Sequence, residues 1–281
     1  MQSLNINDIN TDLILTGKIT RYFRIGRVAS HTLAGVIIAS TILPLASKPL
    51  KRCIIKWWST RLLAAFNIRV ISHGHIPQAK DRLKTTMFVA NHISWTDVHA
   101  LNSLIALRFV AKSEIRSWPV IGFLTYKANA LFIDRAKRQD AGRIVNTAAH
   151  SLKSGDNLCF FPEGTTTDGT EIKRFKSSLI QAAIETNATI RPVAIRYPMP
   201  NGSANIRLAY AGETTMLESM RQILSQKNPV VELFFLAPII VEELAEQDKD
   251  RRSLTHSVEY LIRHTLDLHF QPIIDSTVKA N

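Results

Sequence analysis

Cysteine is rare in this sequence, and the spacings that metal centres need are missing. Its 281 residues include two cysteines, Cys53 and Cys159, which stand far apart and match no metal-binding pattern. Two such cysteines define no disulfide framework, so we expect reduced and inert thiols. No G-x-S-x-G motif occurs either, which leaves no credible serine nucleophile of that type.

Acidic residues are scarce relative to basic ones. The sequence has 23 Asp and Glu against 35 Lys and Arg, which gives a formal net charge of +12. Such an excess predicts either nucleic acid or an anionic membrane surface as a partner. Because the cations flank apolar segments and form no patch interleaved with aromatic residues, we expect a membrane surface and no nucleic acid.

Long apolar runs are also limited. The run "TLAGVIIASTILPLA" at residues 32–46 has 15 residues, short of the ~20 that a perpendicular transmembrane helix requires. Cations follow it at once, which argues against a cleaved signal peptide. In residues 54–70 apolar side chains recur every fourth position, and Trp57 and Trp58 lie beside cations, as suits a lipid headgroup zone. The alternative for this second stretch is an amphipathic helix packed on the core.

These features divide the chain in two. We expect residues 1–71 to form a basic lead-in and membrane-anchoring helices, and residues 72–281 to form one α/β domain. In the second part, short runs rich in β-branched and aromatic residues predict strands at 85–90, 107–112, 130–135, 157–164, 188–198, 204–212 and 230–240. Helical periodicity appears at 97–106, 137–153, 176–187, 214–226 and 251–270. This alternation predicts a mixed, mostly parallel sheet covered by helices on both faces.

Two of the predicted strands end in reactive side chains. His92 ends the first strand, and Asp97 follows in what we expect to be the first turn of the next helix, capped by Ser94 or Thr96. In that arrangement Asp97 accepts a hydrogen bond from one ring nitrogen of His92 and leaves the other nitrogen as a base. The alternative is a loop histidine with a separate capping aspartate, and the spacing alone does not decide between them.

A second strand end carries the stretch "CFFPEGTTTDG" at residues 159–169. It places Glu163, Gly164 and Thr165 at the carboxyl edge of the sheet, where ligands gather in α/β folds. Lys112 and Arg135 follow two other predicted strands and could bind a phosphate. The alternatives are a plain turn at 159–169 and solvated basic residues at the other two positions.

Together these blocks resemble the glycerolipid acyltransferase family. The blocks stand in the family's order: Asn-His-x4-Asp at 91–97, Phe-Ile-Asp-Arg at 132–135, Phe-Pro-Glu-Gly-Thr at 161–165, and a strand containing Pro192. The resemblance covers roughly residues 55–245, and the sequence resembles the bacterial lysophosphatidic acid acyltransferases, which belong to the best-known branch of this family. Two positions depart from the pattern: Asn129 stands where a glycine is frequent, and Thr166 where many relatives have Arg.

The resemblance implies transfer of a fatty acyl group from acyl-CoA or acyl carrier protein to the free hydroxyl of a lysolipid. Lysophosphatidic acid, which would become phosphatidic acid, is the first candidate for this acceptor. It implies His92 and Asp97 as catalytic residues, with Lys112, Arg135, Glu163, Gly164 and Thr165 binding substrate. No metal or cofactor is implied beyond the acyl donor. An oxyanion hole is expected at the helix start after His92. The site is expected at the cytoplasmic face of a bacterial inner membrane.

Three rival functions fit the same sequence. One is acylation of another lysolipid, such as lyso-ornithine lipid. A second is a membrane lipid-binding protein without turnover. A third is hydrolysis of acyl thioesters, with water in place of the acceptor. The oligomeric state, the acyl-chain length and the choice between the two donors do not follow from the sequence.

Overall fold

The computed structural model describes residues 15–77, 85–134 and 138–270. This part of the chain forms an eight-stranded sheet with the order β1-β7-β6-β2-β5-β3-β4, and β8 pairs with β6. The strands are β1 (Arg69–Gly74), β2 (Thr86–Ala90), β3 (Arg108–Lys112), β4 (Leu131–Ile133), β5 (Leu158–Phe160), β6 (Thr189–Arg196), β7 (Val230–Phe235) and β8 (Ile239–Ile240). Strands β6, β2, β5, β3 and β4 run parallel to one another, and β7 and β8 are antiparallel to β6. The predicted mixed, mostly parallel sheet is confirmed.

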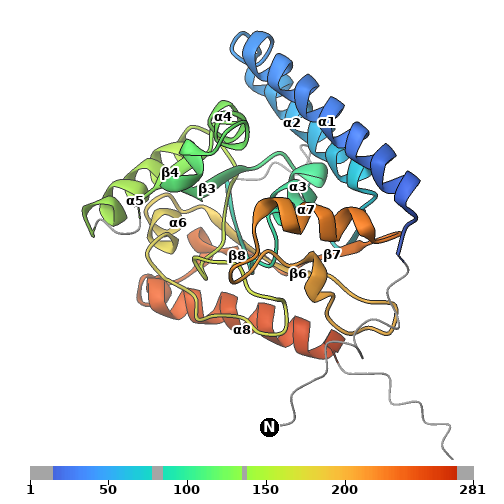
Figure 1. Ribbon diagram of the computed structural model, residues 1–281. Helices are drawn as coiled ribbons and strands as arrows, with labels where there is room; N and C mark the ends of the chain where they lie inside the picture. The colour runs from blue at the N-terminus through green and yellow to red at the C-terminus, as the bar shows by residue number, and fades with distance from the viewer. Residues whose placement is uncertain (1–14, 78–84, 135–137, 271–281) are drawn as a thin grey trace, which may run out of the picture.

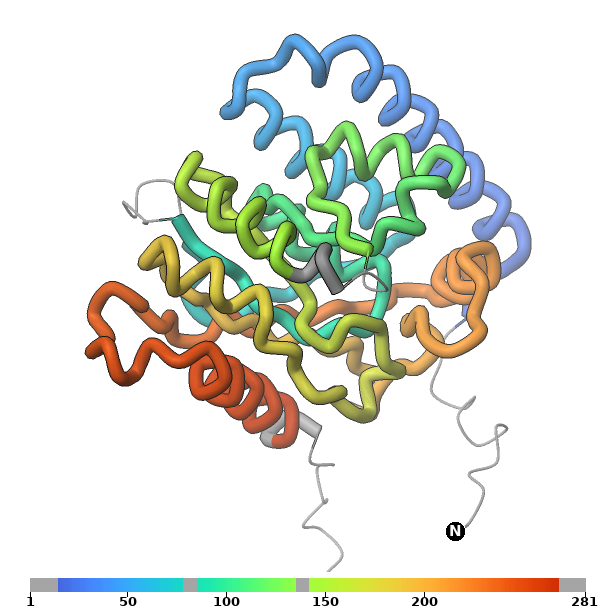
Figure 2. Tube along the Cα trace, turned by 90° about the vertical axis from the view of Figure 1, so that its left-hand side faces the viewer, coloured from blue at the N-terminus to red at the C-terminus, as the bar shows by residue number. Residues whose placement is uncertain are grey.

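Helices cover both faces of this sheet (Figure 1, Figure 2). They are α1 (Lys18–Thr41), α2 (Lys48–Phe66), α3 (Thr96–Leu104), α4 (Ile121–Lys127), α5 (Arg138–Lys153), α6 (Ile180–Glu185), α7 (Met216–Ser225) and α8 (Arg251–Phe270). On one face α5, α6 and α8 bury an apolar cluster that includes Ile144, Ile180 and Val258. On the other, α2, α3 and α7 bury a second cluster that includes Leu101 and Ile223. Because β2 is buried along its whole length between these layers, its carboxyl end is held firmly.

Helices α1 and α2 form a hairpin at one side of the sheet (Figure 1). The apolar run at 32–46 is not one helix: α1 continues from the basic lead-in and ends at Thr41, three residues before Pro44, which cannot continue it. In the described residues, we find no helix whose length and apolar content would let it cross a bilayer. Membrane anchoring by this hairpin therefore stays a prediction.

The α1–α2 hairpin is joined to the rest of the molecule by a buried arginine. Arg24 on α1 is 6% exposed and donates to the backbone oxygens of Leu224, Gln226 and Lys227, at the carboxyl end of α7. Strand β1 pairs with β7 in the same region, so the sheet begins three residues before the expected boundary at 72. The hairpin and the α/β part are thus continuous in packing.

One predicted strand is wrong. Residues 204–212 contain a short 3-10 helix, Ile206–Leu208, in an irregular segment. Its backbone bonds run to loops and strand ends, with the Tyr210 nitrogen donating to the Ile93 oxygen and the Asn205 nitrogen to the Tyr197 oxygen. The apolar pattern that suggested a strand reflects the burial of Leu208 and Ala209 within this irregular segment.

Candidate active site

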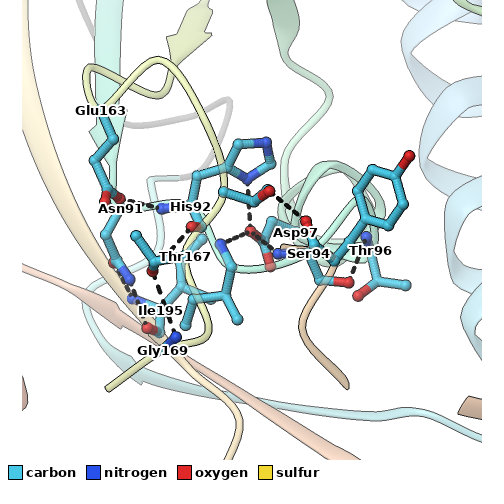
Figure 3. Close-up of polar contacts among 12 residues, drawn as sticks. Asn91, His92, Ser94, Thr96, Asp97, Glu163, Thr167, Gly169 and Ile195 are labelled. Atoms are coloured by element: carbon cyan, nitrogen blue, oxygen red, sulfur yellow. Dashed lines mark hydrogen bonds and ion pairs between the residues drawn. The ribbon is translucent and has the colours of Figure 1, made fainter. Parts of the chain in front are cut away.

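The carboxyl end of β2 is fixed by an asparagine that takes the place of backbone pairing. The Asn91 side chain donates to the Ile195 oxygen at 2.9 Å and accepts from the Ile195 nitrogen at 2.7 Å. It therefore mimics a strand residue toward β6 and is itself 2% exposed. The chain leaves the sheet at the next residue, His92, in a direction that this pairing sets (Figure 3).

His92 and Asp97 meet in the structure. The Nδ1 of His92 lies 2.8 Å from Oδ2 of Asp97, and Asp97 stands in the first turn of α3 with no exposed surface. The same Oδ2 accepts the backbone N–H groups of Ile93 and Ser94 at 2.8 and 2.9 Å (Figure 3). An ionised carboxylate with these donors keeps the proton of His92 on Nδ1, which leaves Nε2 as the acceptor. The expected pairing of these two residues is therefore present.

The start of α3 differs from the expectation in two details. The Ser94 hydroxyl accepts the Thr96 nitrogen only at 3.4 Å, and Asp97 itself caps the turn by reaching back to two N–H groups. Those two N–H groups are occupied by the carboxylate, so an oxyanion hole built from them is not formed here. Asp97 thus binds the His92 ring and also stabilises the first turn of α3 through backbone hydrogen bonds.

Glu163 is buried behind His92 and holds its backbone. One carboxylate oxygen accepts the His92 nitrogen at 2.7 Å, and the other accepts the Lys173 nitrogen at 2.8 Å. Burial raises the pKa of Glu163 to about 7, against these two N–H bonds, which favour the charged form. The Thr167 nitrogen donates to the His92 oxygen at 2.9 Å, so both backbone groups of His92 are held by the loop after β5 (Figure 3).

His92 opens into an apolar cleft of about 570 Å³. The cleft is walled by α1, α2, α3, α4 and β3, with Ala39, Leu62, Phe109 and Leu124 among its lining residues. The ring of Phe161 stacks on the His92 imidazole with 3.8 Å between ring centroids and 7° between their planes. A volume of this size suits a small-molecule ligand, and its lining suits a hydrocarbon chain.

The predicted substrate-binding residues fall in three places. Lys112, Gly164 and Thr165 line the cleft, and Gly164 has a φ of 82°, which favours glycine. Glu163 is 4% exposed, and both of its oxygens are bonded to backbone nitrogens beside the cleft. Arg135 lies outside the described residues. Among the described residues, no group of three His, Cys, Asp or Glu side chains could hold a metal ion.

Two residues near the site escaped the sequence analysis. Tyr197 follows β6, and its hydroxyl donates to Oδ1 of Asp97 at 2.5 Å. His99 on α3 lines the cleft beside Trp58, and burial lowers its pKa to about 4. No sequence signal joins Tyr197 to Asp97, because the two are a hundred positions apart and only the sheet order brings them together.

Comparison with known proteins gives a consistent result. A family model described as "Acyltransferase" matches residues 68–196. The lyso-ornithine lipid O-acyltransferase of Pseudomonas aeruginosa is 34% identical over 218 residues, which cover 78% of this chain and 80% of that protein. The 1-acyl-sn-glycerol-3-phosphate acyltransferase of Neisseria gonorrhoeae is 34% identical over 177 residues, 63% of this chain and 68% of that protein.

A solved structure shares the fold. The 1-acyl-sn-glycerophosphate acyltransferase PlsC of Thermotoga maritima superposes with a TM-score of 0.60, covering 87% of this chain and 97% of that one at 20% identity. The His-Asp pair, the third block at the end of β5 and the extent of the sequence match agree with one assignment. This chain belongs to the acyltransferase family.

Proposed function

We propose that the protein transfers a fatty acyl group from a thioester donor, acyl-CoA or acyl carrier protein, to the free hydroxyl of a lysolipid. The observation that carries this proposal is the His92–Asp97 pair, in which the His92 member lines an apolar cleft and Asp97 is buried behind it. The cleft supplies room for the acyl chain, and the pair supplies a base beside it.

His92 acts as the general base in this proposal. Its Nε2 takes the proton of the acceptor hydroxyl while the hydroxyl oxygen forms a bond to the thioester carbonyl carbon. Asp97 stabilises the resulting imidazolium through Nδ1. The tetrahedral intermediate then loses the thiolate as its C–S bond breaks, and the imidazolium returns the proton to the sulfur. A base placed in this way contributes about 10²–10⁴ in rate.

Direct transfer without an acyl-enzyme agrees with the positions of the cysteines. Cys53 is exposed on α2, and Cys159 is fully buried in β5, where burial raises the pKa of its thiol well above the ordinary value. A neutral, enclosed thiol is a poor nucleophile. We therefore propose that the acceptor oxygen attacks the donor itself.

Lysophosphatidic acid is one proposed acceptor. Lys112 at the cleft and Arg135 beyond β4 would bind its phosphate, and Gly164 and Thr165 would lie along its glycerol part. Glu163 holds the backbone of His92 through a hydrogen bond, and in this way it would influence where the acceptor lies relative to the His92 ring.

Lyso-ornithine lipid is the second proposed acceptor, and one observation favours it. The Pseudomonas relative with that activity in its name matches more of this chain, 78%, than the Neisseria lysophosphatidic acid enzyme, 63%. The cleft lining also carries both charge signs, Glu114 with Lys112 and Lys127, as an ornithine headgroup would require.

Attachment to a membrane surface would bring the site to its lipid acceptor. The side of α1 that faces away from the protein carries exposed apolar side chains at helical spacing: Ile19, Tyr22, Phe23, Leu33 and Ile37. The opposite side of α1 packs on α2 and α7. A helix that is apolar on both sides can lie in the plane of a membrane interface. We propose that this membrane is a bacterial inner membrane and that the protein lies on its cytoplasmic face.

The proposal is tested with the purified full-length protein and mixed lipid vesicles. Lysophosphatidic acid and lyso-ornithine lipid are offered separately, each with acyl-CoA or acyl carrier protein thioester. Wild type should form one diacylated product at the expense of the thioester, and His92→Ala should lose at least about 10²-fold of that rate while keeping its melting temperature. Product formation that persists in His92→Ala contradicts the mechanism, and thioester loss without a lysolipid requirement identifies a hydrolase.

A further inference from the structure

The two oxygens of the Asp97 carboxylate have separate partners. Oδ2 accepts hydrogen bonds from the His92 ring and from the N–H groups of Ile93 and Ser94. Oδ1 accepts a hydrogen bond from the Tyr197 hydroxyl at 2.5 Å. The Thr96 hydroxyl lies 2.7 Å from the Tyr197 hydroxyl, and the Tyr197, Thr96 and Asp97 residues are at most 2% exposed.

The direction of these hydrogen bonds follows from the charge on the carboxylate. An ionised Asp97 only accepts, so Tyr197 must donate to Oδ1, and its oxygen then accepts the hydroxyl proton of Thr96. Burial and the nearby charge of Asp97 raise the pKa of Tyr197 well above its ordinary value, so the phenol keeps its proton at any working pH. The donor to Oδ1 is therefore permanent.

We propose that Tyr197 is a positioning residue, which fixes the Asp97 carboxylate through Oδ1 and limits how strongly that carboxylate stabilises the protonated form of His92. A short bond to a carboxylate spreads its charge toward the phenol, and less charge is left to attract an imidazolium. The inference rests on the proposed role of His92 as the base.

Tyr197 can act in this way because of where it stands in the sheet. It comes directly after β6, whose neighbour in the sheet is β2, and His92 follows two residues after the end of β2. The hydroxyl therefore links the end of β6 to the first turn of α3, where Asp97 lies. A tyrosine on a buried strand end loses little further conformational freedom, which suits it to hold a neighbouring group in place.

Few other titratable groups face this carboxylate within the described residues. The Cys159 thiol on β5 lies near enough for the charge of Asp97 to act on its pKa, which burial already raises, and it stays neutral. Glu163, whose pKa is about 7, holds the His92 backbone and titrates in the range of interest. The test must therefore follow His92 itself and not only the activity.

The experiment compares the titration of His92 in wild type and in Tyr197→Phe, using full-length protein with ¹³C-labelled histidine. The chain has nine histidines, and the resonance that disappears in His92→Gln assigns the signal. We expect Tyr197→Phe to move the His92 signal change to higher pH, because the carboxylate regains charge and stabilises the imidazolium more strongly. In acyl-transfer assays kcat should fall about 10-fold near neutral pH with KM within about 2-fold, and partly recover at higher pH.

Two further variants separate this role from a structural one. Thr96→Val should shift the His92 titration in the same direction by a smaller amount. It removes the hydrogen bond that the Tyr197 hydroxyl accepts, which is one bond further from the Asp97 carboxylate. Tyr260→Phe, at an exposed tyrosine of α8, should change neither titration nor rate. A lower melting temperature with an unshifted His92 titration in folded Tyr197→Phe overturns the proposal. Failure of wild type to acylate any lysolipid would overturn the proposed function instead, and the titration would still decide the role of Tyr197.

Discussion

The end of β2 and the α1–α2 hairpin meet at the same cleft and are built in opposite ways. At the end of β2, the polar groups of Asn91, His92, Asp97 and Glu163 are bonded to one another or to backbone, and all but His92 are at most 4% exposed. On α1, the side away from the protein leaves large apolar side chains exposed, among them Ile19 at 87% and Phe23 at 67%.

This difference separates two tasks. Hydrogen bonds with fixed geometry hold the His92 ring and backbone in one position beside the cleft, and such an arrangement tolerates little change. Apolar surface is non-directional, so the hairpin can contact a lipid surface in many arrangements. The cleft between them is open to both, with His92 on one wall and α1 and α2 on the other.

Asp97→Asn should give the largest effect. An amide in this position removes the charge that stabilises protonated His92 and turns an N–H donor toward groups that are themselves donors. We expect acyl transfer to fall by about 10²–10⁴-fold. The assay is the vesicle reaction at saturating donor, with the circular dichroism spectrum of the variant as the control for folding. A variant that is folded and fully active would contradict the assignment of Asp97.

The buried Glu163 should make stability depend on pH. Its pKa is about 7 in the folded protein and 4.5 ordinarily, so the folded state binds more protons between these values. Its contribution to the free energy of unfolding is therefore intact below pH 4.5. This contribution, up to about 3 kcal/mol, is lost as the pH rises through about 7. His99, whose pKa falls from 6.5 to about 4, acts in the opposite sense between these two pH values.

Comparison with Glu163→Gln isolates this dependence. The variant cannot titrate, so the difference in urea unfolding free energy between wild type and Glu163→Gln should shrink as the pH rises from 5 to 8. The His99 contribution is common to both proteins and cancels in the difference. A difference that stays constant over this range would show that Glu163 does not titrate there.

The sequence predicted the ordered region better than the hairpin. His92, Asp97, Gly164 and Thr165 could be placed because apolar strands end at them, and parallel strands share one edge of a sheet. The link from Tyr197 to Asp97 could not, since it depends on β6 lying next to β2. Strand β1 was missed because residues 69–74 mix polar and apolar side chains at one edge of the sheet, where little burial marks them.

The sequence described the hairpin incompletely for a related physical reason. The sequence reveals the apolar run at 32–46. It does not reveal that α1 has two apolar sides, one packed against the protein and one facing outward. The basic lead-in suggested headgroup contacts, whereas Arg24 within it is buried and caps α7. A pattern of charges along a sequence does not distinguish an arginine in solvent from one that binds carbonyl groups.

Removal of that arginine should loosen the hairpin. Arg24→Met keeps the aliphatic stem and leaves three carbonyl groups without their charged donor, so we expect a loss of about 2 kcal/mol in unfolding free energy. Arg27→Met is the matched control, because Arg27 makes one exposed bond to the Ala64 oxygen and should cost at most about 0.5 kcal/mol. Urea unfolding measures both, and equal effects would refute a special role for Arg24.

The smallest effect is expected on the outward side of α1. Phe23→Ser and Ile37→Ser should each weaken binding to anionic lipid vesicles about 5-fold, since partial burial of such a side chain is worth ~1 kcal/mol. Neither residue lines the cleft, so activity on a detergent-dispersed lysolipid should be unchanged. Vesicle flotation at several protein-to-lipid ratios measures the binding.

Tyr260→Ser is the matched control for this last test. Tyr260 is 60% exposed on α8, which lies across the sheet from α1 (Figure 1). If membrane contact is made through α1, this variant should bind vesicles as wild type does, although it removes comparable apolar surface. Equal losses in all three variants would mean that apolar surface anywhere on the molecule promotes binding. Loss confined to Phe23→Ser and Ile37→Ser would place the membrane on the hairpin side, where the lysolipid can reach the cleft without leaving the lipid surface.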